Sequence, residues 1–345
     1  MQFYDFKEIE ERVILIGVQT EQDEDVAASL DELEELAATA GAVTVGKVIQ
    51  NREAVHPGTY IGKGKIEEVA ALLAAYDANG VICDDELSPA QMNNLERELD
   101  CKVMDRTLLI LDIFAGRAIT SEGKIQVELA QLRYRSARLV GLRESLSRLG
   151  GGIGTRGPGE KKLETDRRLI RTRISALKAE LAQVEKHREL IRGKRTRGNL
   201  KTAAIVGYTN AGKSTLLNTL TGAGILAEDK LFATLDPTTR VLELKDGQQI
   251  LLTDTVGFIR KLPHHLVEAF KSTLEEAKYA DYIIHVVDAS NPQAELQMHT
   301  VYETLRELGA TGKKIITLLN KQDQVQGEAL RDFRADYTVK CSART

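Results

Sequence analysis

The chain has 345 residues, of which 42% are hydrophobic and 28% charged, and a formal net charge of −4. These values exclude a fibrous or disordered protein and leave room for two or three globular domains. The three cysteines show no metal-ligand spacing, which favours a reducing compartment, and no apolar run approaches the roughly 18 residues of a membrane span. Since no signal peptide opens the chain, we expect a cytoplasmic monomer, with peripheral association with a membrane as an alternative.

The first 120 residues alternate between short apolar runs and helical patterns. Strands are predicted at 12–18, 42–49, 81–83 and 102–104, and helices at 25–40, 65–76 and 89–99. Ser88 and Pro89 suit the cap and first position of the last helix. This order predicts an α/β domain with a parallel sheet. Within it, residues 60–65 (YIGKGK) either bind an anion or form a helix-start loop with solvated lysines, and we favour the loop.

Residues 121–200 form a basic segment in a chain whose net charge is negative. They hold 20 Lys and Arg against 9 Asp and Glu, or +11, so the remainder carries −4 − 11 = −15. Amphipathic patterns predict two long helices at 125–149 and 161–191, joined as an antiparallel hairpin. A basic segment between acidic ones is typical of a protein with a phosphate-rich partner.

The predicted connection between these helices, residues 150–159, has six glycines in ten positions. It is either a flexible linker or a surface for folded RNA, which is recognised mainly through phosphate and 2′-OH contacts. We favour RNA, because the loop lies at the end of a basic hairpin. The predicted RNA-binding residues are Gly151, Gly152, Gly154, Arg156, Gly157 and Gly159.

A phosphate-binding loop, Gly207-x-x-x-x-Gly212-Lys213-Ser214, stands between a strand-like run at 203–206 and a helix-like run. Its glycines allow backbone N–H groups to approach phosphate oxygens. Lys213 is expected to reach the β and γ phosphates, and Ser214 to replace a water on Mg²⁺. The motif predicts nucleoside triphosphate binding.

Two motifs that follow later strands predict recognition of guanine and a loop that responds to the bound nucleotide. Asp254-Thr255-Val256-Gly257 follows a buried run, so Asp254 can join the Mg²⁺ shell and the Gly257 N–H can contact the γ-phosphate. Asn320-Lys321-Gln322-Asp323 follows another. Its Asp323 carboxylate can accept from N1–H and the 2-amino group of guanine, which adenine lacks. A backbone N–H near Ser342 and Ala343 would meet the guanine O6.

These motifs, with LFATLDPTTR at 231–240 and GGGIGTRGPGEKKLETDRR at 150–168, resemble the HflX family of translation-factor-related GTPases from residue 13 onward. The resemblance implies Mg²⁺ held by Ser214, Thr234 and Asp254, with Thr238 and Thr239 as alternatives to Thr234. Phe258 stands where Ras-like enzymes carry the water-orienting Gln, so no catalytic residue is predicted and slow, externally stimulated GTP hydrolysis is implied. The predicted nucleotide-binding residues are Gly207, Tyr208, Thr209, Asn210, Ala211, Gly212, Lys213, Ser214, Thr215, Phe232, Ala233, Thr234, Asp254, Thr255, Val256, Gly257, Asn320, Lys321, Asp323, Ser342 and Ala343.

The resulting prediction is an α/β protein in three parts: an N-terminal domain (1–120), a basic hairpin (121–198) and a P-loop GTPase domain (199–345) that lacks its last helix. The family resemblance implies binding of GTP, GDP, the large (50S) ribosomal subunit and its rRNA, with dissociation of stalled or idle 70S ribosomes under stress such as heat shock. Two alternatives are an RNA-remodelling or RNA-modifying enzyme gated by the GTPase domain, and an interaction module without turnover.

Overall fold

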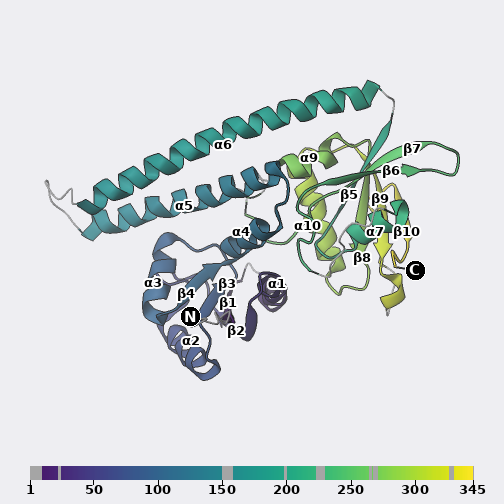
Figure 1. Ribbon diagram of the computed structural model, residues 1–345. Coiled ribbons are helices and arrows are strands. Elements are labelled where there is room, and N and C mark those ends of the chain that lie inside the picture. Colours follow the sequence, from purple (N-terminus) through teal and green to yellow (C-terminus); the bar gives the residue numbers. More distant parts are fainter. Residues whose placement is uncertain are drawn as a thin grey trace, which may run out of the picture. The chain divides into compact units, whose positions relative to one another are not determined.

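The computed structural model (Figure 1) describes residues 10–21, 25–149, 158–197, 200–222, 230–263, 266, 271–325 and 330–344. The chain divides into two compact units. One comprises Met1–Ile113 and Leu132–Thr172, and the other comprises Phe114–Gln131 and Arg173–Thr345.

The first unit contains a four-stranded, all-parallel sheet in the order β2-β1-β3-β4. Its strands are β1 (Arg12–Gln19), β2 (Val43–Asn51), β3 (Gly80–Cys83) and β4 (Lys102–Asp105). The inner strands β1 and β3 are almost continuously buried, as expected where helices cover both faces of a parallel sheet. The predicted parallel α/β architecture is confirmed.

The described helices of this unit are α1 (Val26–Thr39), α2 (Lys63–Tyr76), α3 (Pro89–Leu99) and α4 (Arg106–Arg117), whose last turn belongs to the second unit. Three of these four, α1, α3 and α4, begin at side chains that accept hydrogen bonds from their first N–H groups, whereas α2 begins at Gly62 without such a cap. Ser88 is the cap of α3 and Pro89 is its first residue, as the sequence predicts. Ser88 also forms a capping box with Gln91. Helix α4 is absent from the prediction. It follows β4 without a loop, because Asp105 ends the strand and also accepts the Leu108 N–H at 2.8 Å.

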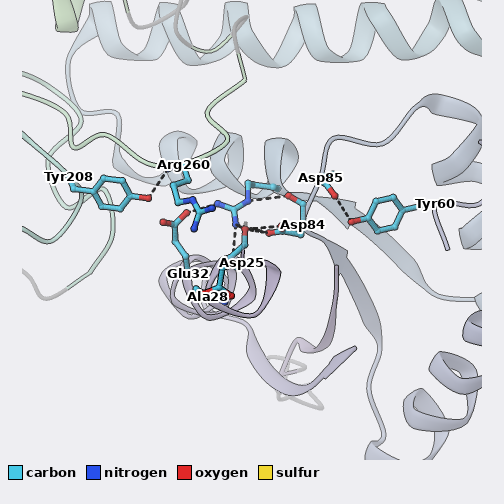
Figure 2. Close-up of polar contacts among 10 residues, drawn as sticks. Asp25, Ala28, Glu32, Tyr60, Asp84, Asp85, Tyr208 and Arg260 are labelled. Carbon is cyan, nitrogen blue, oxygen red and sulfur yellow. Dashed lines mark hydrogen bonds and ion pairs between the residues drawn. The ribbon is translucent and has the colours of Figure 1, made fainter. Parts of the chain in front are cut away.

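Buried charges occupy the carboxyl ends of β3 and β4. Figure 2 shows two of the acidic residues, Asp84 after β3 and Glu32 of α1. Arg106 is 1% exposed and donates to Asp84 and Glu32, each at 2.6 Å. Burial alone would lower the pKa of Arg106, but the two carboxylates outweigh it and raise that pKa. Asp105 likewise pairs with Arg138 at 2.6 Å. These pairs lie at the edge of the sheet where open α/β sheets usually bind ligands.

Two long helices connect the sheets: α5 (Ser121–Leu149) and α6 (Pro158–Arg197). Within the second unit, Glu128 pairs with Arg173 at 2.7 Å and Glu122 with Arg188 at 3.0 Å. From Glu122 to Glu128 along α5, the paired residue on α6 moves back from Arg188 to Arg173. The two helices therefore run antiparallel over this stretch. The complete hairpin stays a prediction, since 150–157 lie outside the described residues. Among the described helices, none has the length and apolarity needed to cross a membrane.

The second unit contains a six-stranded sheet in the order β10-β9-β8-β5-β7-β6, parallel except for the β6–β7 pair. Its strands are β5 (Lys201–Gly207), β6 (Thr238–Glu243), β7 (Gln249–Asp254), β8 (Tyr282–Asp288), β9 (Lys314–Asn320) and β10 (Tyr337–Lys340). Its helical elements are α7 (Lys213–Thr221), α9 (Lys271–Tyr279), α10 (Ala294–Glu307) and the short η1 (Gln322–Gln324). Parallel strands β5, β7 and β9 therefore end at one edge, which brings the three predicted motifs together.

Candidate nucleotide-binding site

Close packing explains why two positions of the phosphate loop are glycine. A Cβ on Gly207 would lie 2.2 Å from the Val286 carbonyl oxygen. A Cβ on Gly212, which has a φ of +95°, would lie 2.4 Å from Asn320 Nδ2. Contacts this short are incompatible with any side chain, so the loop passes between β8 and the end of β9 only as glycine.

Lys213 begins α7 and lies almost fully buried in the loop. Its Nζ donates to the Tyr208 carbonyl oxygen at 2.7 Å, which directs the amine across the loop. Burial lowers the pKa of Lys213 to about 8, although the charge of Asp254 acts against this shift. An anion in the loop would favour the charged amine, as phosphate binding requires.

Three oxygens from three separate segments meet beside this lysine. Ser214 Oγ lies 2.7 Å from Asp254 Oδ2 and 2.8 Å from Thr234 Oγ1. Asp254 is fully buried, and its Oδ1 has no hydrogen-bond partner among the described residues. Burial raises the pKa of Asp254, with Lys213 and Ser214 acting against it. One carboxylate and two hydroxyls are ligands that Mg²⁺ accepts, so the residues fit the predicted ion.

The geometry also favours Thr234 over the two alternative threonines. Thr238 and Thr239 belong to β6, and Thr239 Oγ1 lies 2.9 Å from Thr253 Oγ1 within the β6–β7 pair. Within the described part of the chain, no three His, Cys, Asp or Glu side chains gather as a metal site of another kind. The metal-binding role of Thr234 stays a prediction, now with a geometry that supports it.

The segment after Asp254 is bonded directly to the phosphate loop. The Thr209 N–H donates to the Phe258 carbonyl at 2.8 Å, and the Phe258 N–H donates to the Gly207 carbonyl at 3.1 Å. The Phe258 ring is 1% exposed, so it fills the core and offers no group to orient a water. The Arg260 N–H donates to the Tyr208 hydroxyl at 2.8 Å (Figure 2). The sequence predicts Tyr208 only as a member of the phosphate loop, because its hydrogen bond with Arg260 joins residues 52 positions apart and has no local pattern.

Asn320 connects the guanine motif to the phosphate loop. It is 3% exposed, its Nδ2 donates to the Ala211 carbonyl at 2.9 Å, and its Oδ1 accepts the Ala343 N–H at 2.8 Å. Asp323 lies in η1 and, with Ser342 and Ala343, lines a cavity of about 140 Å³. Asn320 therefore holds two loops in place, and Asp323 lines the cavity where the base is predicted to bind.

The other predicted sites find less support. In the 60–65 loop, the Gly62 N–H donates to Gln50 Oε1 at 2.8 Å, and Lys65 pairs with Glu68 at 2.7 Å, which favours the helix-start loop. Of the predicted RNA-binding residues, five lie outside the described residues: Gly151, Gly152, Gly154, Arg156 and Gly157. Gly159 falls in the first turn of α6.

Three family models match consecutive parts of the chain. Residues 27–115 match "GTP-binding GTPase N-terminal", residues 117–195 match "GTP-binding GTPase Middle Region", and residues 202–321 match "50S ribosome-binding GTPase". Together they cover the N-terminal sheet, the long helices and the nucleotide site.

Curated relatives and solved structures agree with these models. A protein of Lacrimispora saccharolytica named GTPase HflX is 71% identical over 99% of this chain and 81% of its own length. A protein of Escherichia coli with the same name is 47% identical over 92% of this chain and 74% of its own length.

The crystal structure of a GTP-binding protein from Sulfolobus solfataricus in complex with GDP aligns over 96% of this chain and 93% of that one, with 26% identity and a TM-score of 0.50. The structure of a complex of SsGBP and GDP aligns over the same shares with 28% identity and a TM-score of 0.53. With the phosphate loop, the guanine motif and these relatives in agreement, the chain belongs to the GTPase HflX family and is a P-loop GTPase that hydrolyses GTP.

Proposed function

We propose that this GTPase binds the large ribosomal subunit in a GTP-controlled manner and separates stalled or idle 70S ribosomes under stress. The main support is the meeting of Thr234 with Ser214 and Asp254, because it ties the 231–240 segment to the nucleotide site. A segment held in this way changes when the γ-phosphate leaves. The description "50S ribosome-binding GTPase" of the model that matches residues 202–321 supports the choice of partner.

In this proposal Ser214, Thr234 and Asp254 hold Mg²⁺, which would neutralise charge on the β and γ phosphates. Lys213 contacts the same phosphates, and Asp323 selects guanine. The buried Phe258 leaves the attacking water without a side chain to orient it, so hydrolysis by the protein alone is slow. The ribosome then supplies the group or the rearrangement that accelerates it.

The net charge of +11 on residues 121–200 supports the proposal that this segment binds the RNA of the ribosomal subunit. We propose the division of labour predicted from the sequence: residues 1–120 as the N-terminal domain, 121–198 as the RNA-binding hairpin and 199–345 as the GTPase domain. The glycine-rich connection at 150–159 would make the closest approach to rRNA.

The test pairs two measurements on the full chain and on a variant with residues 151–159 shortened. The variant is expected to retain its GTP turnover in isolation, because the loop lies outside the nucleotide site. In a sucrose gradient with a non-hydrolysable GTP analogue, it is expected to leave the 70S fraction intact, whereas the parent reduces it. Large-subunit affinity of the parent should also fall steeply as salt rises.

Equal subunit separation by parent and variant would reduce the loop to a spacer. Adding ribosomes, free RNA or neither to the turnover assay distinguishes the alternatives. Stimulation by free RNA alone would favour an RNA-modifying or RNA-remodelling enzyme, and the absence of any turnover would favour an interaction module.

A further inference from the structure

The carboxylate of Asp236 lies at the start of helix α5, far from it in sequence but within the same unit. Its Oδ2 accepts the Ile119 N–H and the Thr120 N–H, both at 3.0 Å, and its Oδ1 accepts the Thr120 hydroxyl. The Thr120 Oγ1 in turn accepts the Gly123 N–H at 3.0 Å. Asp236 and Thr120 therefore satisfy N–H groups that the beginning of α5 would otherwise leave unpaired.

A second contact joins the 231–240 segment to helix α4, on the other side of Thr234. Phe232 is 2% exposed, and its ring meets the edge of Phe114 with centroids 4.7 Å apart and planes at 76°. Phe232 adopts a φ of +54°, a conformation that a bulky side chain keeps only where its surroundings impose it. Phe114 lies near the end of α4, five residues before Ile119.

Thr234 is thus fixed by two neighbours that are anchored outside the nucleotide site. Phe232 precedes it by two residues and packs on α4, while Asp236 follows it by two and bonds to the start of α5. Between these anchors, Thr234 Oγ1 lies 2.8 Å from Ser214 Oγ. A chain this short between two anchors cannot move Thr234 far without disturbing at least one of them.

We propose that Asp236 is a positioning residue that holds Thr234 in its Mg²⁺- and γ-phosphate-binding place and thereby couples the nucleotide to helix α5. The inference rests on the proposed role of Thr234, and it names the contact through which the nucleotide state reaches the long helices. A negative charge is favourable at a helix N-terminus, so the bonded arrangement stabilises both segments. Because such coupling is reciprocal, GTP tightens the start of α5, and a tightened α5 favours GTP over GDP.

Two variants disturb the contact from opposite sides. Asp236→Ala removes the carboxylate, whereas Gly123→Ala leaves the 231–240 segment unchanged but places a Cβ 2.5 Å from Asp236 Oδ1, so the carboxylate must move. Gly116→Ala is the matched control, since its Cβ would meet nothing within 4 Å. Asp236→Asn keeps one acceptor oxygen without the charge and should lie between parent and Asp236→Ala.

The readout is the affinity for a non-hydrolysable GTP analogue and for GDP, each measured by fluorescence titration with Mg²⁺. Asp236→Ala is expected to weaken binding of the GTP analogue about fivefold to tenfold, the range that loss of one helix cap allows. It should weaken binding of GDP less than about twofold. Gly123→Ala should shift the ratio in the same direction, and the double variant should add little, because both changes remove one contact. Gly116→Ala should leave the ratio at the parent value.

Hydrogen exchange gives the reciprocal measurement without ribosomes. In the parent, the amides of Ile119 and Thr120 should exchange more slowly with the GTP analogue than with GDP, and Asp236→Ala should abolish the difference. Equal losses for the analogue and GDP would show a merely structural contact, and equal exchange in both states of the parent would overturn the coupling. Neither readout uses the ribosome, so failure of the proposed ribosomal function and failure of this inference are separate results.

Discussion

The two hydrogen bonds of Asn320 make a direct prediction about nucleotide affinity. Asn320→Ala leaves the Ala211 carbonyl and the Ala343 N–H without their present partner, and both residues are buried. An unsatisfied buried polar group costs about 1–3 kcal/mol, so the two together cost about 2–6 kcal/mol where water cannot replace the amide. The neighbouring cavity of about 140 Å³ admits water, which points to the lower half of that range, about 3 kcal/mol.

That cost should appear mainly as lost affinity, because the two bonds align loops that must both contact the nucleotide. At 1.4 kcal/mol per factor of ten, about 3 kcal/mol corresponds to roughly a hundredfold weaker GDP binding. Asn320→Asp keeps an acceptor for the Ala343 N–H but turns a carboxylate oxygen toward the Ala211 carbonyl, so it should bind no more tightly than the alanine variant.

Calorimetric titration with GDP and Mg²⁺ measures the affinity, and urea unfolding in the absence of nucleotide measures the stability. Asn291→Ala is a suitable control, because its Oδ1 accepts the Gln293 N–H at 2.8 Å within one turn and Asn291 is not among the residues that line the cavity. A GDP affinity of Asn320→Ala within about threefold of the parent, with an unchanged urea midpoint, would refute the argument that unsatisfied buried groups set this cost.

Three further predictions concern base choice, ion pairs and pH. Asp323→Asn replaces an acceptor by a donor, so a competition titration should show preference moving from GTP toward xanthosine triphosphate; unchanged preference would remove Asp323 from the base site. Arg106→Met should lower the free energy of unfolding by about 3–5 kcal/mol in urea, because it leaves buried carboxylates without their partner, whereas Arg173→Met, at a half-exposed pair, should change that free energy much less. Burial lowers the pKa of His285 although Asp332 acts against the shift, so the unfolded state binds more protons and the free energy of unfolding should fall as pH drops below about 6.5. His285→Gln should flatten this dependence of stability on pH. An equal dependence in parent and variant would contradict the prediction.

Much of the nucleotide site could be predicted from the sequence, because its chemistry depends on residue types at fixed spacings. Gly207 and Gly212 occupy positions where a Cβ has no room, and β5, β7 and β9 carry their motifs to one edge of the sheet. Local patterns also predicted most strands and helices. They did not predict β6, β8, α9 or α10. They also failed for α4, because Asp105 serves both β4 and the helix and leaves no loop between them.

Contacts between distant segments could not be predicted in this way. Arginine is usually found on the surface, yet Arg106 is buried because it pairs with Asp84, which follows β3, and with Glu32 of α1. Asp236 lies in the 231–240 motif, in which only the threonines are predicted to be functional. Its partners Thr120 and Ile119 lie 116 and 117 residues earlier in the chain. Such roles depend on three-dimensional proximity, which a single sequence does not encode in any local spacing.

In the mechanism proposed here, the linkage between Thr234 and α5 determines how a partner and GTP act on each other. A partner that binds the long helices only while Asp236 is bonded to α5 must raise the affinity for GTP by the factor by which GTP raises the affinity for that partner, typically about 5–150-fold. GDP cannot maintain the contact as well, because the γ-phosphate that holds Thr234 is gone. The buried Phe258 delays this loss, since it offers no group to orient water. The lifetime of the partner-bound state is therefore set by the rate of hydrolysis, and a partner that accelerates hydrolysis sets the time of its own release.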